Sequence, residues 1–152
     1  MRLIEKMYYL AKLENGVHRT LEENGKSNPR ILEYLKACDD LSDDDKATET
    51  TSWCAAFQSW LCKLSGGNFN SPMARAWLHA TGFKPVTNPN EGDLVILKRL
   101  IDGVDDGISG HVSMFVKFDN KIVWLYGGNQ HNEVGLHPYQ RKNIIGYRTS
   151  LD

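Results

Sequence analysis

The sequence predicts an α+β fold, with helices in the first half of the chain and an antiparallel sheet in the second. Apolar residues recur at the spacing of amphipathic helices up to about residue 80. Beyond Pro85 they gather in short runs rich in Val, Ile and aromatic residues, separated by Gly, Asp and Asn, as is typical of strands. The chain has 152 residues with no repeat and no linker between the halves, so we expect one domain over residues 1–152.

Two helices are expected before the acidic segment 39–52. The first ends at the glycine stop Asn15-Gly16, and its apolar stripe consists of Ile4, Met7, Tyr8 and Ala11. The second begins at the capping sequence Ser27-Asn28-Pro29, and its apolar face consists of Ile31, Tyr34, Leu35 and Cys38. Segment 39–52 holds five aspartates and one glutamate among Thr and Ser, so we interpret it as a surface loop.

A third helix over residues 53–64 is expected to be buried, because it is apolar nearly all round and carries no charge until Lys63. The sequence Ser65-Gly66-Gly67 ends it. A fourth helix is expected between the cap Ser71-Pro72 and the stop Gly82. Its apolar face consists of Met73, Ala76, Trp77 and Ala80.

Four strands are expected, over residues 94–97, 111–118, 121–126 and 144–148. Asp119-Asn120 predicts a tight turn that joins the second and third strands in a hairpin. A three-residue loop, 119–121, would pair Phe118 with Ile122 and His111 with Asn129, which places the last two side chains on one face. We expect the buried helix to pack on that same face, which also carries Ser113, Phe115, Val123, Leu125 and Gly127.

The composition argues against several classes of function. Eighteen basic and nineteen acidic residues give a formal charge of −1, which offers no general positive field for nucleic acid. No apolar stretch approaches the roughly 18–20 residues that span a bilayer. The cysteines Cys38, Cys54 and Cys62 form neither a Cys-x-x-Cys pair nor a zinc-binding spacing, so we expect no disulfide scaffold and no metal site.

Three residues could carry chemistry together: Cys54, His111 and Asn129. Cys54 lies in the first turn of the buried helix, where unpaired N–H groups and the helix dipole favour a thiolate. His111 opens a strand, where a neutral imidazole could take the thiol proton, and Asn129 could orient that ring. Free cysteine is also a common core residue, and we interpret Cys38 and Cys62 in that way. The remaining histidines are interpreted as ordinary surface or core residues: His18, His79, His131 and His137.

Four segments occur in a fixed order: 51–57 (TSWCAAF), 91–96 (EGDLVI), 110–116 (GHVSMFV) and 125–130 (LYGGNQ). Together they resemble the successive motifs of the NlpC/P60 and CHAP superfamily, most closely its small, phage-associated, single-domain members. The opening 28–31 (NPRI) and the ending 145–148 (IGYR) extend the resemblance over nearly the whole chain.

The resemblance implies a papain-like core that cleaves an amide bond of peptidoglycan, with Cys54 as nucleophile, His111 as base and Asn129 as the third residue. Two positions depart from the pattern. Ser52 stands where relatives tend to have proline, and Gly127 stands where many CHAP members carry an acid, so the third role rests on Asn129.

Four further residues are expected to border the substrate: Trp53, Gly127, Gly128 and Gln130. Trp53 precedes the nucleophile, and the two glycines would let substrate approach the backbone closely.

The leading functional hypothesis is an endolysin-like peptidoglycan hydrolase that is either a cysteine peptidase or an N-acetylmuramoyl-L-alanine amidase and works through an acyl-enzyme. Three alternatives remain. One is an interbacterial toxin with the same chemistry and an immunity partner. Another is a catalytically inactive wall-binding module on the same fold. The last is a metallohydrolase that uses several of the five histidines.

We expect peptidoglycan as partner, no cofactor, no nucleic acid, no membrane insertion and a monomer. Glu5 and Lys6 interrupt the start of the chain where a signal peptide needs an apolar stretch. We therefore expect synthesis in the cytoplasm of a bacterial host and action at the cell wall after release or delivery. The acidic segments 39–45 and 102–106 lack the spaced ligands of a calcium loop and are interpreted as solvated surface.

Overall fold

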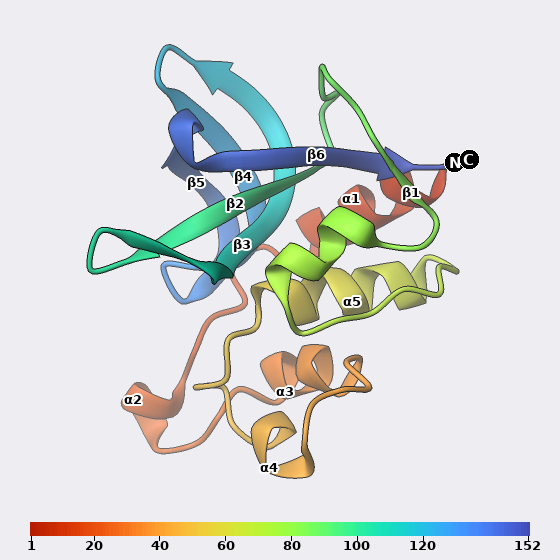
Figure 1. The fold of residues 1–152 in the computed structure, drawn as a ribbon. Helices are drawn as coiled ribbons and strands as arrows, with labels where there is room; N and C mark the ends of the chain where they lie inside the picture. Colours follow the sequence, from red (N-terminus) through yellow and green to blue (C-terminus); the bar gives the residue numbers. More distant parts are fainter.

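The computed structural model describes residues 1–152 and confirms an α+β fold, with a helical first half followed by a six-stranded antiparallel sheet (Figure 1). The helices of the first half are α1 (Leu3–Leu13), α2 (Leu21–Asn24), α3 (Pro29–Lys36), α4 (Asp43–Lys46), α5 (Cys54–Leu64) and the 3₁₀-helix η1 (Ala74–His79). The second half consists of β1 (Phe83–Pro85), β2 (Leu94–Ile101), β3 (Val104–Asp119), β4 (Ile122–Gln130), β5 (Glu133–Gln140), the 3₁₀-helix η2 (Arg141–Asn143) and β6 (Ile144–Ser150).

Helices α1, α3 and α5 confirm the first three predicted helices. The Asn28 side chain caps α3 by accepting the N–H of Arg30 at 2.9 Å, as the sequence Ser27-Asn28-Pro29 predicts. Eight of the eleven residues of α5 are buried, which agrees with its apolar composition. The one-turn helices α2 and α4 lie in polar stretches and were not predicted.

The fourth predicted helix is present as the 3₁₀-helix η1 and is shorter than expected. Its buried residues Ala74 and Trp77, with Ala80 just beyond, recur at a spacing of three. That period matches the three residues per turn of a 3₁₀-helix better than the 3.6 of an α-helix. Met73, assigned to the apolar face, is exposed instead.

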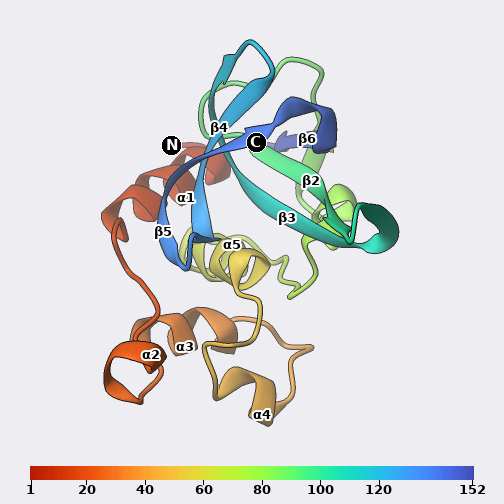
Figure 2. The same ribbon diagram turned by 90° about the vertical axis from the view of Figure 1, so that its left-hand side faces the viewer.

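The molecule is built in layers, with α1 and α5 against one face of the sheet and α3 on the far side of α5 (Figures 1 and 2). The strand order is β1-β6-β2-β3-β4-β5. The main core lies between the sheet and the helices. It receives Leu94, Ile96, Val112, Met114 and Tyr126 from the central strands.

A second, smaller core lies on the other face of the sheet and contains Val95, Leu97, Phe115, Val123 and Leu125. The prediction that the buried helix packs on the face of Phe115, Val123 and Leu125 is therefore wrong. Both faces of these strands are apolar, so alternation along the chain did not distinguish the face that meets α5 from the opposite face.

The predicted β3–β4 hairpin is present, but its turn is one residue shorter than expected. Ile122 pairs with Asp119 and not with Phe118. A bulge in β3 then shifts the register by one residue, so that Met114 pairs with Tyr126, as the predicted register requires. The two differences cancel at the end of the hairpin that leads to the candidate site.

The first and last residues of the chain lie side by side (Figure 1). Arg2 donates hydrogen bonds to the carbonyl oxygens of Ser150 and Asp152, and the N–H of Leu3 donates to the carboxylate of Asp152. These bonds close the molecular surface where the two ends of the chain meet.

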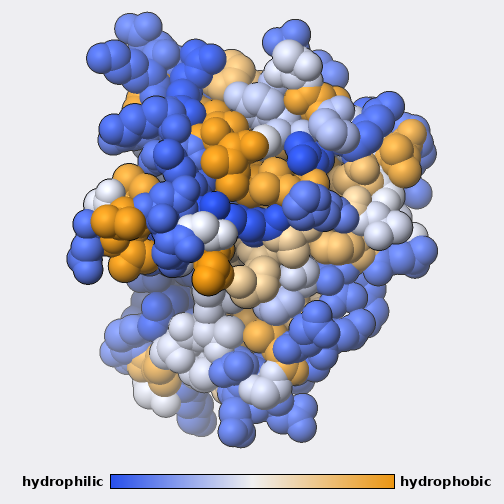
Figure 3. Space-filling model, viewed as in Figure 1, coloured by the Kyte–Doolittle hydropathy of each residue, from blue (hydrophilic) through white to orange (hydrophobic).

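The face shown in Figure 3 is mostly hydrophilic, with apolar atoms on the projecting β2–β3 hairpin. The exposed apolar residues there are Leu100, Ile101, Val104 and Ile108. None of the helices has the length and the apolar character needed to cross a membrane.

Candidate active site

A cleft of about 620 Å³ lies where the start of α5 meets the sheet. Cys54, His111 and Asn129 all line it, so the structure brings the three predicted residues to one place. They come from α5, β3 and β4, which meet at this end of the main core. The fold therefore assembles the site from two elements of the sheet and the first turn of one helix.

The environment of Cys54 favours its thiolate. Burial alone would raise the pKa of this thiol, but the charge and hydrogen bond of His111 and the N–H groups of Val112 and Ala55 outweigh burial, so the pKa of Cys54 is lowered. The Ala55 N–H belongs to the first turn of α5, where backbone donors have no partner within the helix. Such an environment can activate a thiol as a nucleophile.

His111 is the partner of this thiol. Burial favours its neutral form, but the negative charge of Cys54 and hydrogen bonds to Cys54 and Gln130 favour the imidazolium, so the pKa of His111 is raised. Each member of the pair stabilises the charged form of the other. The arrangement therefore supports a thiolate–imidazolium pair.

Gln130 holds the imidazole through its side-chain oxygen. The Oε1 atom lies 3.0 Å from Nε2 of His111 and also accepts the hydroxyl hydrogen of Ser113. The Nε2 atom of Gln130 donates to the carbonyl oxygens of Leu125 at 3.0 Å and Gly135 at 2.6 Å. Since carbonyl groups only accept, these two bonds fix which end of the amide faces the histidine.

The direction of this amide sets the tautomer of His111. An amide oxygen cannot donate, so Nε2 of His111 must carry a hydrogen. In the neutral ring Nδ1 is then the free base, and it is the nitrogen left to face Cys54. The site is therefore prepared for proton transfer between the thiol and Nδ1.

The predicted contact between His111 and Asn129 is wrong, because β4 contains a bulge. Gly127 and Gln130 both pair with β5, but the two residues between them oppose a single residue. Asn129 lies in this bulge with a positive φ of 55°. The extra residue shifts the alternation of side chains by one, so Gln130 reaches the position that Asn129 would occupy in a regular strand.

Asn129 and Gln130 therefore exchange their expected positions. Asn129 was expected to orient the imidazole, and it lines the cleft instead. Gln130 was expected to border the substrate, and it is buried, with only 2% of its surface exposed.

The other residues expected to border the substrate are buried as well. Trp53 is fully buried, with its ring tilted against Tyr34 at a centroid distance of 5.9 Å. A Cβ atom at Gly128 would lie 2.8 Å from Cβ of Phe57, and one at Gly127 would overlap the hydroxyl of Ser113. The glycines thus allow close packing within the protein, which the sequence could not distinguish from close approach by a ligand.

Tyr139 is a site residue that the sequence analysis missed. Its ring stacks on His111 at 5.0 Å between centroids, and its hydroxyl lies 3.2 Å from Nε2 of His111. Burial and the negative charge of Cys54 raise the pKa of Tyr139, so it stays neutral beside the pair. Tyr139 belongs to β5, a strand that the sequence did not predict.

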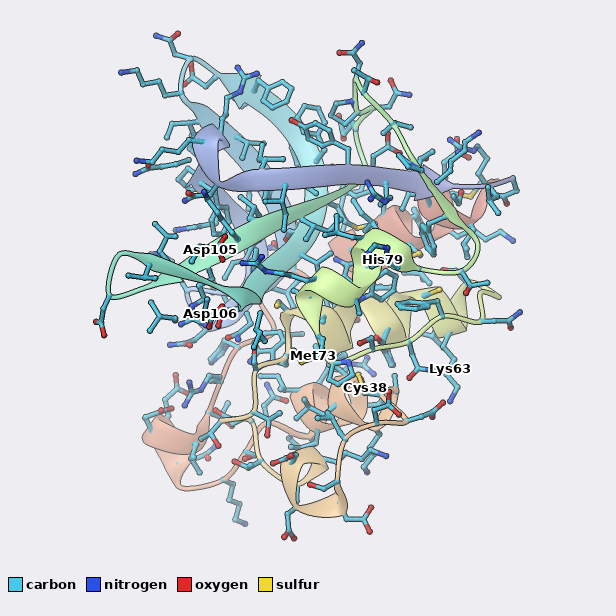
Figure 4. The ribbon with its side chains drawn as sticks, viewed as in Figure 1. Cys38, Lys63, Met73, His79, Asp105 and Asp106 are labelled. Carbon is cyan, nitrogen blue, oxygen red and sulfur yellow. The ribbon has the colours of Figure 1, made fainter.

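The remaining candidate groups lie elsewhere. Cys38 and Cys62 are buried free thiols whose pKa values are raised, chiefly by burial. Figure 4 shows Cys38 near the end of α3 and the carboxylates of Asp105 and Asp106 on the projecting hairpin. Asp106 accepts the N–H and hydroxyl of Ser109, so this acidic segment orders its own loop.

The fold and the site together define an α+β protein in which a helix-borne thiol faces a strand-borne histidine held by an amide. Such an arrangement can attack a carbonyl carbon and protonate a leaving group. Residues 52–148 match the family described as bacteriophage peptidoglycan hydrolase, and this match covers more than half of the chain. The chain belongs to that family of cell-wall hydrolases. No curated protein matches the chain.

Proposed function

We propose that this chain hydrolyses an amide bond of peptidoglycan by nucleophilic catalysis, with Cys54 as nucleophile, His111 as general acid and base, and Gln130 as a positioning residue. The family supplies the substrate class. The observation that carries the mechanism is geometric: the thiol at the start of α5 and the imidazole held by Gln130 line one cleft. The lowered pKa of Cys54 and the raised pKa of His111 agree with it.

The reaction would proceed in two balanced steps. The Cys54 thiolate attacks the amide carbonyl carbon, and the imidazolium of His111 gives its proton to the leaving amine as the carbon–nitrogen bond breaks. A water molecule then loses a proton to His111 and attacks the thioester, which releases the carboxylic acid and returns the thiolate–imidazolium pair. The N–H of Cys54 lies at the start of α5 and would stabilise the oxyanion.

The order of the functional residues also supports the proposal. A cysteine at a helix start followed by a histidine at a strand is the order of the NlpC/P60 and CHAP motifs that this sequence resembles. We therefore propose that the core is papain-like, with Gln130 and not Asn129 in the third position.

The three cysteines provide a direct test. We expect Cys54→Ala to abolish the release of soluble fragments from purified sacculi, and Cys38→Ala and Cys62→Ala to retain most of the wild-type rate. Both control thiols have raised pKa values and lie outside the cleft. An active Cys54→Ala protein, or a folded Cys62→Ala protein without activity, would contradict the assignment.

Inhibitors and product analysis complete the test. We expect a thiol alkylator to inactivate the enzyme and a chelator to leave its rate unchanged, since the proposed nucleophile is a thiolate. Mass spectrometry of the products would show which amide is cut, the one between muramic acid and alanine or one within the stem peptide. Binding to sacculi without any new chain ends would instead support a wall-binding module.

A further inference from the structure

Outside the Cys54–His111 pair, the charged side chains that line the cleft are all basic. Fifteen residues line it, and they include Arg19, Lys98 and Arg99 but no aspartate or glutamate. The whole chain has more acidic than basic residues, with a formal charge of −1. Because the opposite charges of the Cys54–His111 pair cancel, the cleft keeps a net positive charge, unlike the chain as a whole, and this favours an anionic ligand.

Two of the three cations form no salt bridge and no side-chain hydrogen bond within the protein. Arg19 is already engaged, because it forms ion pairs with Glu49 and Glu22. Lys98 and Arg99 are not engaged in this way, although the charge of Lys98 helps to lower the pKa of Asp105. Their hydrogen-bond donors therefore remain available to a ligand in the cleft.

The position of Arg99 is set by an irregularity in β2. The register between β2 and β3 shifts between Lys98 and Leu100, and Arg99 has no partner in the ladder. Bulges of this kind turn a side chain away from the regular alternation. Arg99 is also close enough to the reacting groups for its charge to oppose the rise in the pKa values of His111 and Tyr139.

Stem peptides of peptidoglycan carry free carboxylates next to their amide bonds. A guanidinium binds a carboxylate through two parallel hydrogen bonds, and an ammonium group adds a second positive charge. We propose that Arg99, assisted by Lys98, binds a free carboxylate of the stem peptide beside the amide that is cut, so that the enzyme prefers stem peptides with free carboxylates over amidated ones. This inference rests on the function proposed above.

The test compares two forms of one substrate. Sacculi free of teichoic acid, and therefore of its phosphates, are divided into two portions, and the carboxylates of one portion are converted to amides. The kcat/KM for fragment release is then measured on both portions at one ionic strength, for the wild type, Arg99→Gln and Lys98→Gln. Lys63→Gln is the matched control, because this substitution removes the same charge from an exposed side chain at the far end of α5 (Figure 4).

We expect the wild type and Lys63→Gln to cleave the carboxylate form about tenfold faster than the amidated form, as a charge-assisted hydrogen bond at an exposed site would give. Arg99→Gln should remove most of this preference, and Lys98→Gln should reduce it. The ratio of the two rates is the readout, because the charge of Arg99 also acts on His111 and its removal can change the rate on both forms together.

Three results would overturn the inference. Equal rates of the wild type on both portions would show that no carboxylate is recognised, while the proposed hydrolysis stands. Equal losses of Arg99→Gln on both portions would show that Arg99 acts through the electrostatics of His111 instead. Release from neither portion would overturn the proposed function itself, and the inference with it.

Discussion

The side chain of Gln130 determines which nitrogen of His111 carries a hydrogen, although Gln130 is not itself a member of the reacting Cys54–His111 pair. Its oxygen accepts from His111 and Ser113, and its nitrogen donates to two backbone carbonyls. All four hydrogen-bonding positions of this buried amide are therefore used. A network of this kind holds one tautomer of His111 and leaves little freedom to the ring.

Gln130 should therefore affect both the rate and its dependence on pH. We expect Gln130→Ala to lower kcat by about 10- to 100-fold, as the loss of a group that orients a catalytic base does. The hydrogen bond that His111 donates to Gln130 helps to raise the pKa of His111, so its removal should move the alkaline limb of the pH–rate profile to lower pH.

The control for this experiment is Asn129→Gly. Asn129 has a positive φ of 55°, which glycine adopts without strain, so this variant removes only the side chain that lines the cleft. It should keep the wild-type pH profile. A shifted pH profile in Asn129→Gly together with an unshifted one in Gln130→Ala would instead support the arrangement predicted from the sequence, in which Asn129 orients the imidazole.

The Cys54–His111 pair predicts a bell-shaped dependence of kcat/KM on pH. The proposed ion pair would form at pH values above the pKa of Cys54, which is lowered from its ordinary value of 9.0, and below the pKa of His111, which is raised from its ordinary value of 6.5. The rate should fall on the acid side as Cys54 gains a proton. It should fall on the alkaline side as His111 loses one.

Alkylation of Cys54 by iodoacetamide measures the acid limb directly. In the wild type we expect the rate constant to reach its plateau below pH 9, the ordinary pKa of a thiol. In His111→Ala no imidazolium opposes the effect of burial, which raises the pKa of Cys54. The midpoint of the alkylation rate should therefore move to higher pH. An unchanged midpoint in His111→Ala would refute the ion pair.

At the level of strands and helices, the bulge in β4 decides which amide meets the histidine. Gly128 lies within this bulge, and packing against α5 excludes a side chain there: a Cβ atom would lie 2.8 Å from Cβ of Phe57 and 2.9 Å from the Trp53 ring. The bulge and the contact between β4 and α5 therefore depend on the same short segment.

We expect Gly128→Ala to lower the free energy of unfolding by about 1–3 kcal/mol, since the added methyl group overpacks the core. Urea denaturation would measure the change. Gly135→Ala is the control, because its nearest neighbour would lie 3.7 Å away, and its effect should stay within about 1 kcal/mol. Similar losses in both variants would contradict the explanation by packing.

Local signals explain which elements the sequence could predict. Helices α1, α3 and α5 combine apolar periodicity with a cap or a glycine stop, and each is present. Strand β5 escaped prediction because Gly135 and Pro138 interrupt its pattern, and it is formed by pairing with β4 over much of its length. Tyr139 was missed with it.

The candidate site was predictable in part for the same reason. The helix start at Cys54 and the strand at His111 are local features. The choice between Asn129 and Gln130 depended on a bulge that forms against β5. Gly127-Gly128-Asn129 carries a signal for it, because glycine within a strand and asparagine with positive φ both favour irregular backbone, but that signal does not fix the position.

On the scale of the whole molecule, Glu49 joins two distant parts of the chain beside the cleft. It is buried, with 1% of its surface exposed, in a segment whose acidity predicted a surface loop. Its carboxylate accepts the N–H groups of Thr20, Leu21 and Asn28 and the side chain of Arg19. These donors belong to the segment between α1 and α3, so no local pattern could reveal them.

Glu49→Gln should destabilise the whole fold by about 2–4 kcal/mol near neutral pH, because the amide cannot replace a carboxylate that is fully hydrogen-bonded. Burial alone would raise the pKa of Glu49, but the three N–H groups and Arg19 hold that pKa below its ordinary value of 4.5. The contribution of the carboxylate is therefore present above that value and is lost as the pH falls through the lowered pKa.

Thermal unfolding of both proteins across this range of pH would test the prediction. The difference in Tm between the wild type and Glu49→Gln should be largest near neutral pH and should shrink in acid. A difference that stays constant down to the most acidic pH would show that the carboxylate charge has no part in stability.

The contact between the two ends of the chain makes this protein a suitable candidate for cyclisation. Arg2 already reaches the carbonyl oxygen of Asp152, so a short peptide linker could join the ends without crossing the cleft, which lies at the start of α5 and the β2–β3 side of the sheet. Closing the backbone into a ring restricts the unfolded chain and leaves the folded one almost unchanged. New ends could then be opened in the exposed turn at Gly103, which would give a circular permutant with the same sheet and a different order of strands along the chain.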